Sequence, residues 1–184
     1  MSHTALLLID IQNDYFPSFK DAKWPLENME SAAKNAQQLL TMFRDQNRPV
    51  IHIQHEATST RIPFFQPNTA GIEIHESVVP IGTEPVVVKH KANGFLNTNL
   101  QDVLKELAVT DLVVAGAMTQ NCIDSTTRAA ADLGYNCVVV EDACAAMALE
   151  QDGEMIPAAQ VHKAFIAALG FAFAKIEKTQ DQLV

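Results

Sequence analysis

The sequence lacks the features that mark several large classes of protein. No run of basic residues appears among its 184 residues, and its formal net charge is −9, which argues against a nucleic-acid or anionic-membrane surface. The apolar stretch near the N-terminus is only a handful of residues long and ends at Asp10. It therefore predicts neither a signal peptide nor a membrane span, and we expect a cytoplasmic protein by default.

Cysteine and glycine are also missing where two kinds of site would need them. The three cysteines, an odd number, have no CxxC spacing, which suits a reducing compartment better than a disulfide framework. A dinucleotide site needs a glycine-rich turn after the first strand, but residues 11–14 read Ile-Gln-Asn-Asp. We therefore expect no nicotinamide or flavin cofactor.

The composition that is present is typical of a folded chain. Hydrophobic residues make up 48% of the sequence and charged residues 19%, which excludes disorder. A chain of this length buries a substantial core without disulfides or metals. We expect one domain over residues 1–184.

Short apolar runs alternate with helical patterns along the chain, which predicts an α/β fold with a parallel sheet and helices on both faces. The expected strands are 5–10, 49–54, 85–89, 111–117, 136–141 and 171–176, and the expected helices are about 29–46, 97–108, 122–133 and 157–169. The sequence does not predict a conformation for the loops 11–30 and 55–84. The second is long, polar and proline-bearing, as a lid or pocket wall would be.

Three chemically distinctive residues stand at or just beyond strand ends. Asp10 and Lys89 each end an apolar run, and Cys122 follows another, where a helical pattern begins. A free cysteine is usually a small buried hydrophobe, but a helix start favours the reactive thiolate. The carboxyl ends of parallel strands share one crevice. There Asp10 can take the thiol proton, Lys89 can stabilise anions, and Cys122 can attack a carbonyl carbon.

Four ordered segments resemble the isochorismatase-like cysteine hydrolases, a family that includes nicotinamidases and N-carbamoylsarcosine amidase. They are ALLLIDIQNDYF (5–16), EPVVVKHKANGFLNTNL (84–100), VVAGAMTQNCIDSTTRAAADLGY (113–135) and VVVEDACAA (138–146). The resemblance carries the family's aspartate, lysine and nucleophile onto Asp10, Lys89 and Cys122. It also implies a homo-oligomer and a three-layer α/β/α fold whose six-stranded parallel sheet has the order 3-2-1-4-5-6.

The same resemblance implies the local backbone around the nucleophile. It predicts a cis peptide between Ala117 and Met118, and an oxyanion site made by the backbone N–H groups of Met118 and Cys122. Side chains at strand ends and in the long loops could contact a substrate. The candidates are Phe16, Gln54, His55, Phe64, Phe65 and Phe95.

The metal site of the nicotinamidase branch has no counterpart in this sequence. That branch carries an Asp/His/His set after the second strand, whereas VIHIQHEATST has His52 and His55 and no aspartate. If the strand runs through residue 55, period-two alternation sends the two imidazoles to opposite faces of the sheet. We therefore expect no metal, which also casts doubt on nicotinamide as the substrate.

The sequence thus predicts a cofactor-independent hydrolase of a small amide or carbamoyl-type compound, with no partner other than its substrate and further copies of itself. Two alternatives stay open. An isochorismatase would cleave a vinyl ether through the aspartate without needing the thiol, which the presence of Cys122 disfavours. A catalytically silent binding or assembly protein could have the same fold, because a fold alone does not guarantee chemistry.

Overall fold

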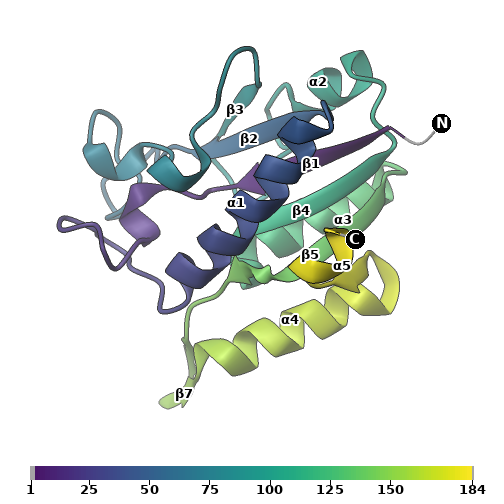
Figure 1. Cartoon of the computed structure of the whole chain (residues 1–184). Coiled ribbons are helices and arrows are strands. Elements are labelled where there is room, and N and C mark those ends of the chain that lie inside the picture. The colour runs from purple at the N-terminus through teal and green to yellow at the C-terminus, as the bar shows by residue number, and fades with distance from the viewer. Residues whose placement is uncertain (1–2, 184) are drawn as a thin grey trace.

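A computed structural model describes residues 3–183 and contains the predicted six-stranded sheet. Its order is β3-β2-β1-β4-β5-β8 and every pair is parallel (Figure 1). The sixth strand is β8 because a separate hairpin precedes it, so the predicted order is confirmed. The strands are β1 (Thr4–Ile9), β2 (Val50–His55), β3 (Val86–Lys89), β4 (Asp111–Ala117), β5 (Asn136–Ala145) and β8 (Lys175–Glu177).

Helices cover both faces of the sheet, which gives the three layers. They are α1 (Met29–Asp45), α2 (Leu100–Glu106), α3 (Asp124–Asp132), α4 (Ala158–Ala172) and α5 (Thr179–Gln182). Leu6 and Leu8 of β1 pack in a core with α1, whereas Leu7 and Ile9 pack in a second core with α2, α3 and α4. This alternation follows from the two-residue period of a strand buried on both sides. None of these helices, within the described 3–183, is long and apolar enough to span a bilayer.

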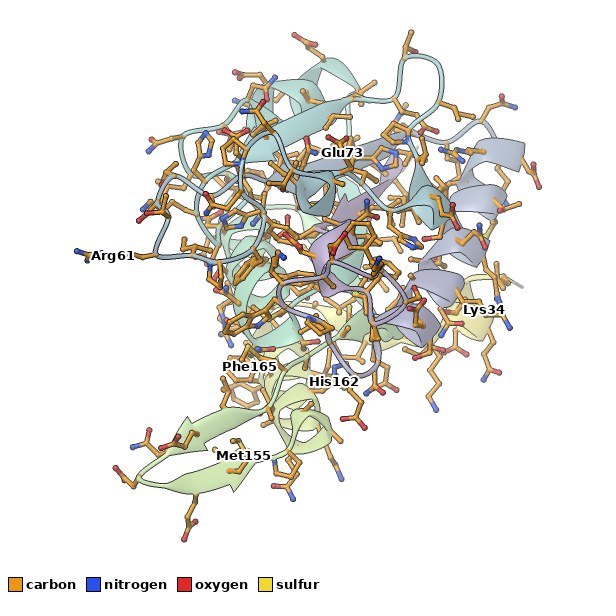
Figure 2. All side chains as sticks on the ribbon, turned by 90° about the vertical axis from the view of Figure 1, so that its left-hand side faces the viewer. Lys34, Arg61, Glu73, Met155, His162 and Phe165 are labelled. Atoms are coloured by element: carbon orange, nitrogen blue, oxygen red, sulfur yellow. The ribbon has the colours of Figure 1, made fainter. Side chains whose placement is uncertain are left out.

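The C-terminal third differs from the predicted elements in two places. A hairpin of β6 (Leu149–Gln151) and β7 (Glu154–Ile156) was not predicted, and it projects from the body of the molecule with Met155 on it (Figure 2). The last strand was predicted at 171–176, but α4 continues through Ala172. A short apolar run such as FAFA (171–174) fits a helix as well as a strand, and here its first two residues belong to the helix.

The loops at the carboxyl ends of the strands are organised by short turns. Three 3-10 turns lie in them: η1 (Asn13–Tyr15), η2 (Ala70–Ile72) and η3 (Glu76–Val78). Gln12 makes an isolated antiparallel bridge with Ile74, so the loop after β1 pairs with the loop between β2 and β3. These two loops lie together over one end of the sheet.

The ends of β1 and β4 lie side by side at the point where the sheet order reverses. Ile9 pairs with Gly116, which has a φ of 131°. A Cβ atom at residue 116 would overlap the carbonyl oxygen of Ile9, so only glycine allows this close approach. The residues that follow the two strands therefore leave the sheet next to each other, at the topological switch point where α/β proteins place their ligands.

Candidate active site

Asp10, Lys89 and Cys122 meet at this switch point. Asp10 follows β1 in the left-handed region with a φ of 53°, and Lys89 is the last residue of β3. The Lys89 Nζ atom lies 2.7 Å from Asp10 Oδ2 and 3.1 Å from Cys122 Sγ. Since β2 separates β3 from β1, only a long side chain reaches across, which explains a lysine at this strand end. The structure thus brings together the three residues that the sequence singled out.

The segment that leads into Cys122 begins with an unusual turn. The Ala117–Met118 peptide is cis, as predicted. Residues Thr119–Ile123 form a π-helical turn in which the Ile123 N–H donates to the Met118 carbonyl at 3.2 Å. Cys122 lies inside this turn, so α3 begins at Asp124, two residues later than expected.

Burial decides the protonation of the cluster. Asp10, Lys89 and Cys122 are 0%, 0% and 1% exposed. Burial raises the pKa of the Cys122 thiol, the Asp10 charge raises it further, and the Lys89 ammonium only partly opposes both. Burial therefore favours the thiol form of Cys122 and opposes the thiolate that a helix start favours.

The other two groups form an ion pair. Burial by itself would raise the pKa of Asp10, but the Lys89 ammonium and His55 hold it below its usual value. Burial would likewise lower the pKa of Lys89, but the Asp10 carboxylate raises it. The resting cluster is a carboxylate and an ammonium in contact, beside a neutral thiol.

His55 is a fourth member of the cluster. It pairs with Lys89 in the β2–β3 register, and its Nδ1 atom lies 2.9 Å from Lys89 Nζ. The Gln12 side chain clamps its backbone, since Gln12 Nε2 donates to the His55 carbonyl at 2.9 Å and the His55 N–H donates to Gln12 Oε1 at 2.8 Å. His52 instead lies 3.0 Å from the Glu84 carboxylate. The two imidazoles have different partners, as their odd spacing along β2 predicts.

A metal ion would have to compete with the lysine for this position. Asp10, His55 and Cys122 each offer a ligand atom within 4.8 Å of the others. The Lys89 ammonium already lies at 2.7, 2.9 and 3.1 Å from these three residues. A cation placed there would meet the ammonium at close range, where like charges repel strongly. The residues do not fit the nicotinamidase-type metal set, and metal independence stays a prediction.

Chelation should leave the protein active. After treatment with 1,10-phenanthroline and EDTA followed by dialysis, we expect hydrolysis to proceed at the untreated rate, because the ammonium supplies the positive charge at the site. Elemental analysis of the same sample should show metal well below one ion per chain. Activity that disappears with chelation and returns with zinc or iron would contradict this expectation.

Four aromatic residues form a cover over the cluster: Tyr15, Trp24, Phe64 and Phe65. Ring centroids are 4.5 Å apart for Tyr15 and Phe65, 5.7 Å for Tyr15 and Phe64, and 5.2 Å for Trp24 and Phe64. The Phe65 ring lies 5.9 Å from that of His55. Figure 2 looks toward the end of the sheet that these loops cover. Two loops thus supply the aromatic cover, one with Tyr15 and Trp24 and the other with Phe64 and Phe65.

The other residues predicted to contact a substrate, Phe16, Gln54 and Phe95, make contacts within the protein outside the aromatic cover. Phe16 stacks on His75 with a centroid distance of 3.5 Å, and Gln54 Nε2 donates to the Ile72 carbonyl at 3.0 Å. Phe95 stacks on Tyr135 at 6.1 Å. Their roles as substrate contacts stay predictions.

Asp14 is a buried residue that the sequence reasoning missed. Its Oδ1 accepts from the Lys23 N–H at 3.0 Å and its Oδ2 accepts from the Phe65 N–H at 2.7 Å. One carboxylate therefore ties together the two loops that carry the aromatic cover. A Cβ atom at Gly71 would overlap this carboxylate, so the glycine leaves room for it. The only signal in the sequence is an acidic residue just beyond a buried strand, and acidic side chains often accept backbone hydrogen bonds in such loops.

Replacing Asp14 with asparagine should loosen the aromatic cover. The amide offers one acceptor oxygen, and its NH₂ group would face one of the two N–H donors, which leaves a buried donor unpaired at a cost of about 1–3 kcal/mol. We expect Cys122 to react with iodoacetamide about tenfold faster in Asp14→Asn, a rise within the range that this cost allows. Asp21→Asn, an exposed change in the same loop, is the matched control. Equal rates in all three proteins would show that Asp14 does not hold the cover closed.

The fold and the site together define the class of this protein. A parallel sheet covered by helices on both faces, with a buried Asp–Lys–Cys cluster at its switch point, is a three-layer α/β fold with a candidate site at the carboxyl ends of its strands. Residues 4–176 match the Isochorismatase domain model, and the chain belongs to that family.

Similar proteins extend over nearly the whole chain. The isochorismatase family protein YddQ of Bacillus subtilis is 51% identical over 177 residues, which cover 96% of this chain and 97% of YddQ. The crystal structure of an isochorismatase hydrolase homologue from Oleispira antarctica is 50% identical, has a TM-score of 0.94, and is matched over 98% of this chain and 95% of its own. A streptothricin hydrolase of Streptomyces noursei is 30% identical over 169 residues, which span 90% of this chain but 59% of that enzyme.

Proposed function

We propose that this protein hydrolyses the carbon–nitrogen bond of a small amide or carbamoyl-type compound, with Cys122 as the nucleophile. The observation that carries the proposal is the single ammonium of Lys89, which contacts both the Asp10 carboxylate and the Cys122 sulfur. A base, a thiol and a shared cation within hydrogen-bonding range are the parts that covalent catalysis by cysteine needs.

The hydrogen bonds of the lysine support this mechanism. Its ammonium has three protons but four neighbours: Asp10, His55 Nδ1, the Lys91 carbonyl and Cys122 Sγ. In the structure the ammonium makes its hydrogen bonds with His55 Nδ1, the Lys91 carbonyl and Cys122 Sγ, and it faces Asp10 Oδ2 as an ion pair at 2.7 Å. When the thiol proton moves to Asp10, that oxygen needs the lysine less and the new thiolate needs it more. The ammonium already donates to Cys122 Sγ, so its positive charge lies beside the sulfur when the thiolate forms.

In the first half of the reaction, Asp10 takes the thiol proton and the Cys122 sulfur bonds to the substrate carbonyl carbon. The carbonyl oxygen becomes negative and is stabilised by the backbone N–H groups of Met118 and Cys122. The carbon–nitrogen bond then breaks, the nitrogen takes the proton held by Asp10, and ammonia or an amine leaves. A thioester remains on Cys122.

In the second half, Asp10 is again a carboxylate and takes a proton from water. The resulting hydroxide attacks the thioester carbon, and the oxyanion is held by the same two N–H groups. The carbon–sulfur bond breaks, the thiolate recovers the proton from Asp10, and a carboxylic acid is released. The cycle needs only water as a second reactant.

The test is a screen of small amides and carbamoyl compounds for ammonia release, combined with intact-mass analysis of acid-quenched protein. We expect turnover of at least one compound and an added acyl mass that peptide mapping places on Cys122. Turnover of a vinyl ether with no adduct would instead favour the aspartate-only isochorismatase reaction. No turnover of any compound would favour a silent binding protein.

A further inference from the structure

The contact between His55 and Lys89 fixes which ring nitrogen of the histidine carries a proton. A lysine ammonium only donates hydrogen bonds. The His55 Nδ1 atom, 2.9 Å from Lys89 Nζ, must therefore accept and has no proton of its own. The proton of the neutral ring is then on Nε2, at the opposite edge of the imidazole.

That second nitrogen is a donor without an acceptor. His55 Nε2 is buried and has no hydrogen-bond partner among residues 3–183. The histidine is 9% exposed, the Gln12 clamp holds its backbone, and the Phe65 ring packs beside it. The ring cannot turn over to satisfy Nε2 without giving up the lysine. A buried donor left in this state costs about 1–3 kcal/mol, which a ligand acceptor would recover.

We propose that the Nε2–H group of His55 binds an oxygen of the substrate other than the carbonyl oxygen at which Cys122 reacts. This inference rests on the proposed function and narrows its substrate class. Ligand atoms of Asp10, His55 and Cys122 lie within 4.8 Å of one another, and the His55 nitrogen that faces this cluster is Nδ1. The Nε2–H group is at the other edge of the same ring, so a small molecule that reaches the sulfur can extend along the imidazole to meet it. The structure thus assigns the histidine to substrate recognition as well as to the support of Lys89.

The charges of the site indicate that this substrate is uncharged. The Asp10 carboxylate and the Lys89 ammonium balance each other, and the raised pKa of Cys122 favours its neutral thiol. A substrate carboxylate would add a buried charge without a counterion, which is costly. A second carbonyl oxygen adds none. The geometry therefore points to a neutral amide with a second carbonyl group, as in a diamide, an imide or a ureide.

The experiment compares three probes of similar size by isothermal calorimetry on the Cys122→Ala protein, in which turnover cannot interfere. Malonamide has the second carbonyl oxygen, butanamide lacks it, and malonamate replaces it with a carboxylate. We expect malonamide to bind about tenfold or more tightly than either of the others, as the loss of one hydrogen bond to a buried donor predicts. Equal binding of malonamide and butanamide, tighter binding of malonamate, or no binding of any probe would overturn the proposal.

Two substitutions of His55 distinguish the role of Nδ1 from the role of Nε2. In His55→Asn the amide oxygen replaces Nδ1 as the acceptor for Lys89, but the distal donor is gone, so the preference for malonamide should fall below about threefold. In His55→Gln the amide reaches the Nε2 position, so the preference should be largely kept. A preference that survives in the asparagine variant would refute a role for Nε2.

The protonation of the ring has its own signature. A ¹H–¹⁵N spectrum of the histidine rings in the unsubstituted protein should show the His55 proton on Nε2 and an unprotonated Nδ1. A proton on Nδ1 would contradict the assignment. Because neither calorimetry nor this spectrum needs turnover, both can succeed where hydrolysis fails. Failure of this inference is therefore distinguishable from failure of the proposed reaction.

Discussion

Cys122→Ala should lose hydrolytic turnover by about 10⁴-fold or more while it keeps its fold. Removal of the nucleophile of a covalent mechanism has effects of this size, because the remaining groups cannot form the acyl intermediate. The side chain that is lost is small, so we expect a destabilisation of only about 1 kcal/mol from the cavity. Steady-state rates and thermal unfolding measured on the same preparation check both parts.

The control for this substitution is Cys137→Ala. Cys137 is also a buried free cysteine, but it lies near the start of β5, where it pairs with Leu112 at the far end of β4 from the site. Its loss should leave turnover unchanged. If Cys122→Ala kept full activity, the thiol would have no part in the chemistry, and the aspartate-only route would take the place of the amidase mechanism.

Lys89→Met should cost both activity and stability. Methionine has a similar length but no charge, so the Asp10 carboxylate would be buried without its ion partner, a change that typically costs about 3–5 kcal/mol. Alkylation of Cys122 at neutral pH should also slow, because the ammonium is the group that lowers the pKa of this thiol. Urea unfolding and iodoacetamide labelling measure the two effects.

The stability loss in Lys89→Met should shrink as the pH falls. In the unsubstituted protein the pKa of Asp10 is lowered, so its contribution is present above its unfolded pKa of 3.8 and is lost as the pH drops through the folded value. Without the ammonium, burial raises the pKa of Asp10 above its unfolded value, so protonation of Asp10 stabilises the folded variant.

A double substitution separates loss of charge from loss of packing. Adding Asp10→Asn to Lys89→Met removes the orphaned charge and should recover part of the stability at pH 7. A double variant no more stable than Lys89→Met would show that the ion pair is not the cause.

Much of the fold could be predicted from the sequence, because apolar runs alternate with helical patterns. The three central residues could be predicted because they stand at or just beyond strand ends. Asp10 and Lys89 interrupt apolar runs with a charge, and parallel strands gather such ends on one side of the sheet. The resemblance of the sequence to a known family predicted the sheet order and the cis peptide. The hairpin at 149–156 was not predicted, since its few residues have no core-facing pattern and are mostly exposed.

The parts that could not be predicted depend on tertiary burial. Burial of Cys122, which a sequence does not display, raises the pKa of its thiol and opposes the effect of a helix start. The hydrogen bond from the Phe65 N–H to the Asp14 carboxylate joins two loops through residues that are 51 positions apart in the sequence. Likewise, the sequence does not show that His55 Nε2 lacks a hydrogen-bond partner, because this depends on where the surrounding residues lie in the fold.

The position of Lys89 on an outermost strand links function to local stability. Among residues 3–183, β3 pairs with β2 alone. It has four residues, of which Val86 and Val88 are 43% and 44% exposed. Short edge elements with exposed side chains open at a lower free energy than the interior of a sheet. Detachment of β3 would withdraw the ammonium and leave the rest of the core folded. Heat inactivation should therefore begin below the temperature of global unfolding, with this one strand as its first step.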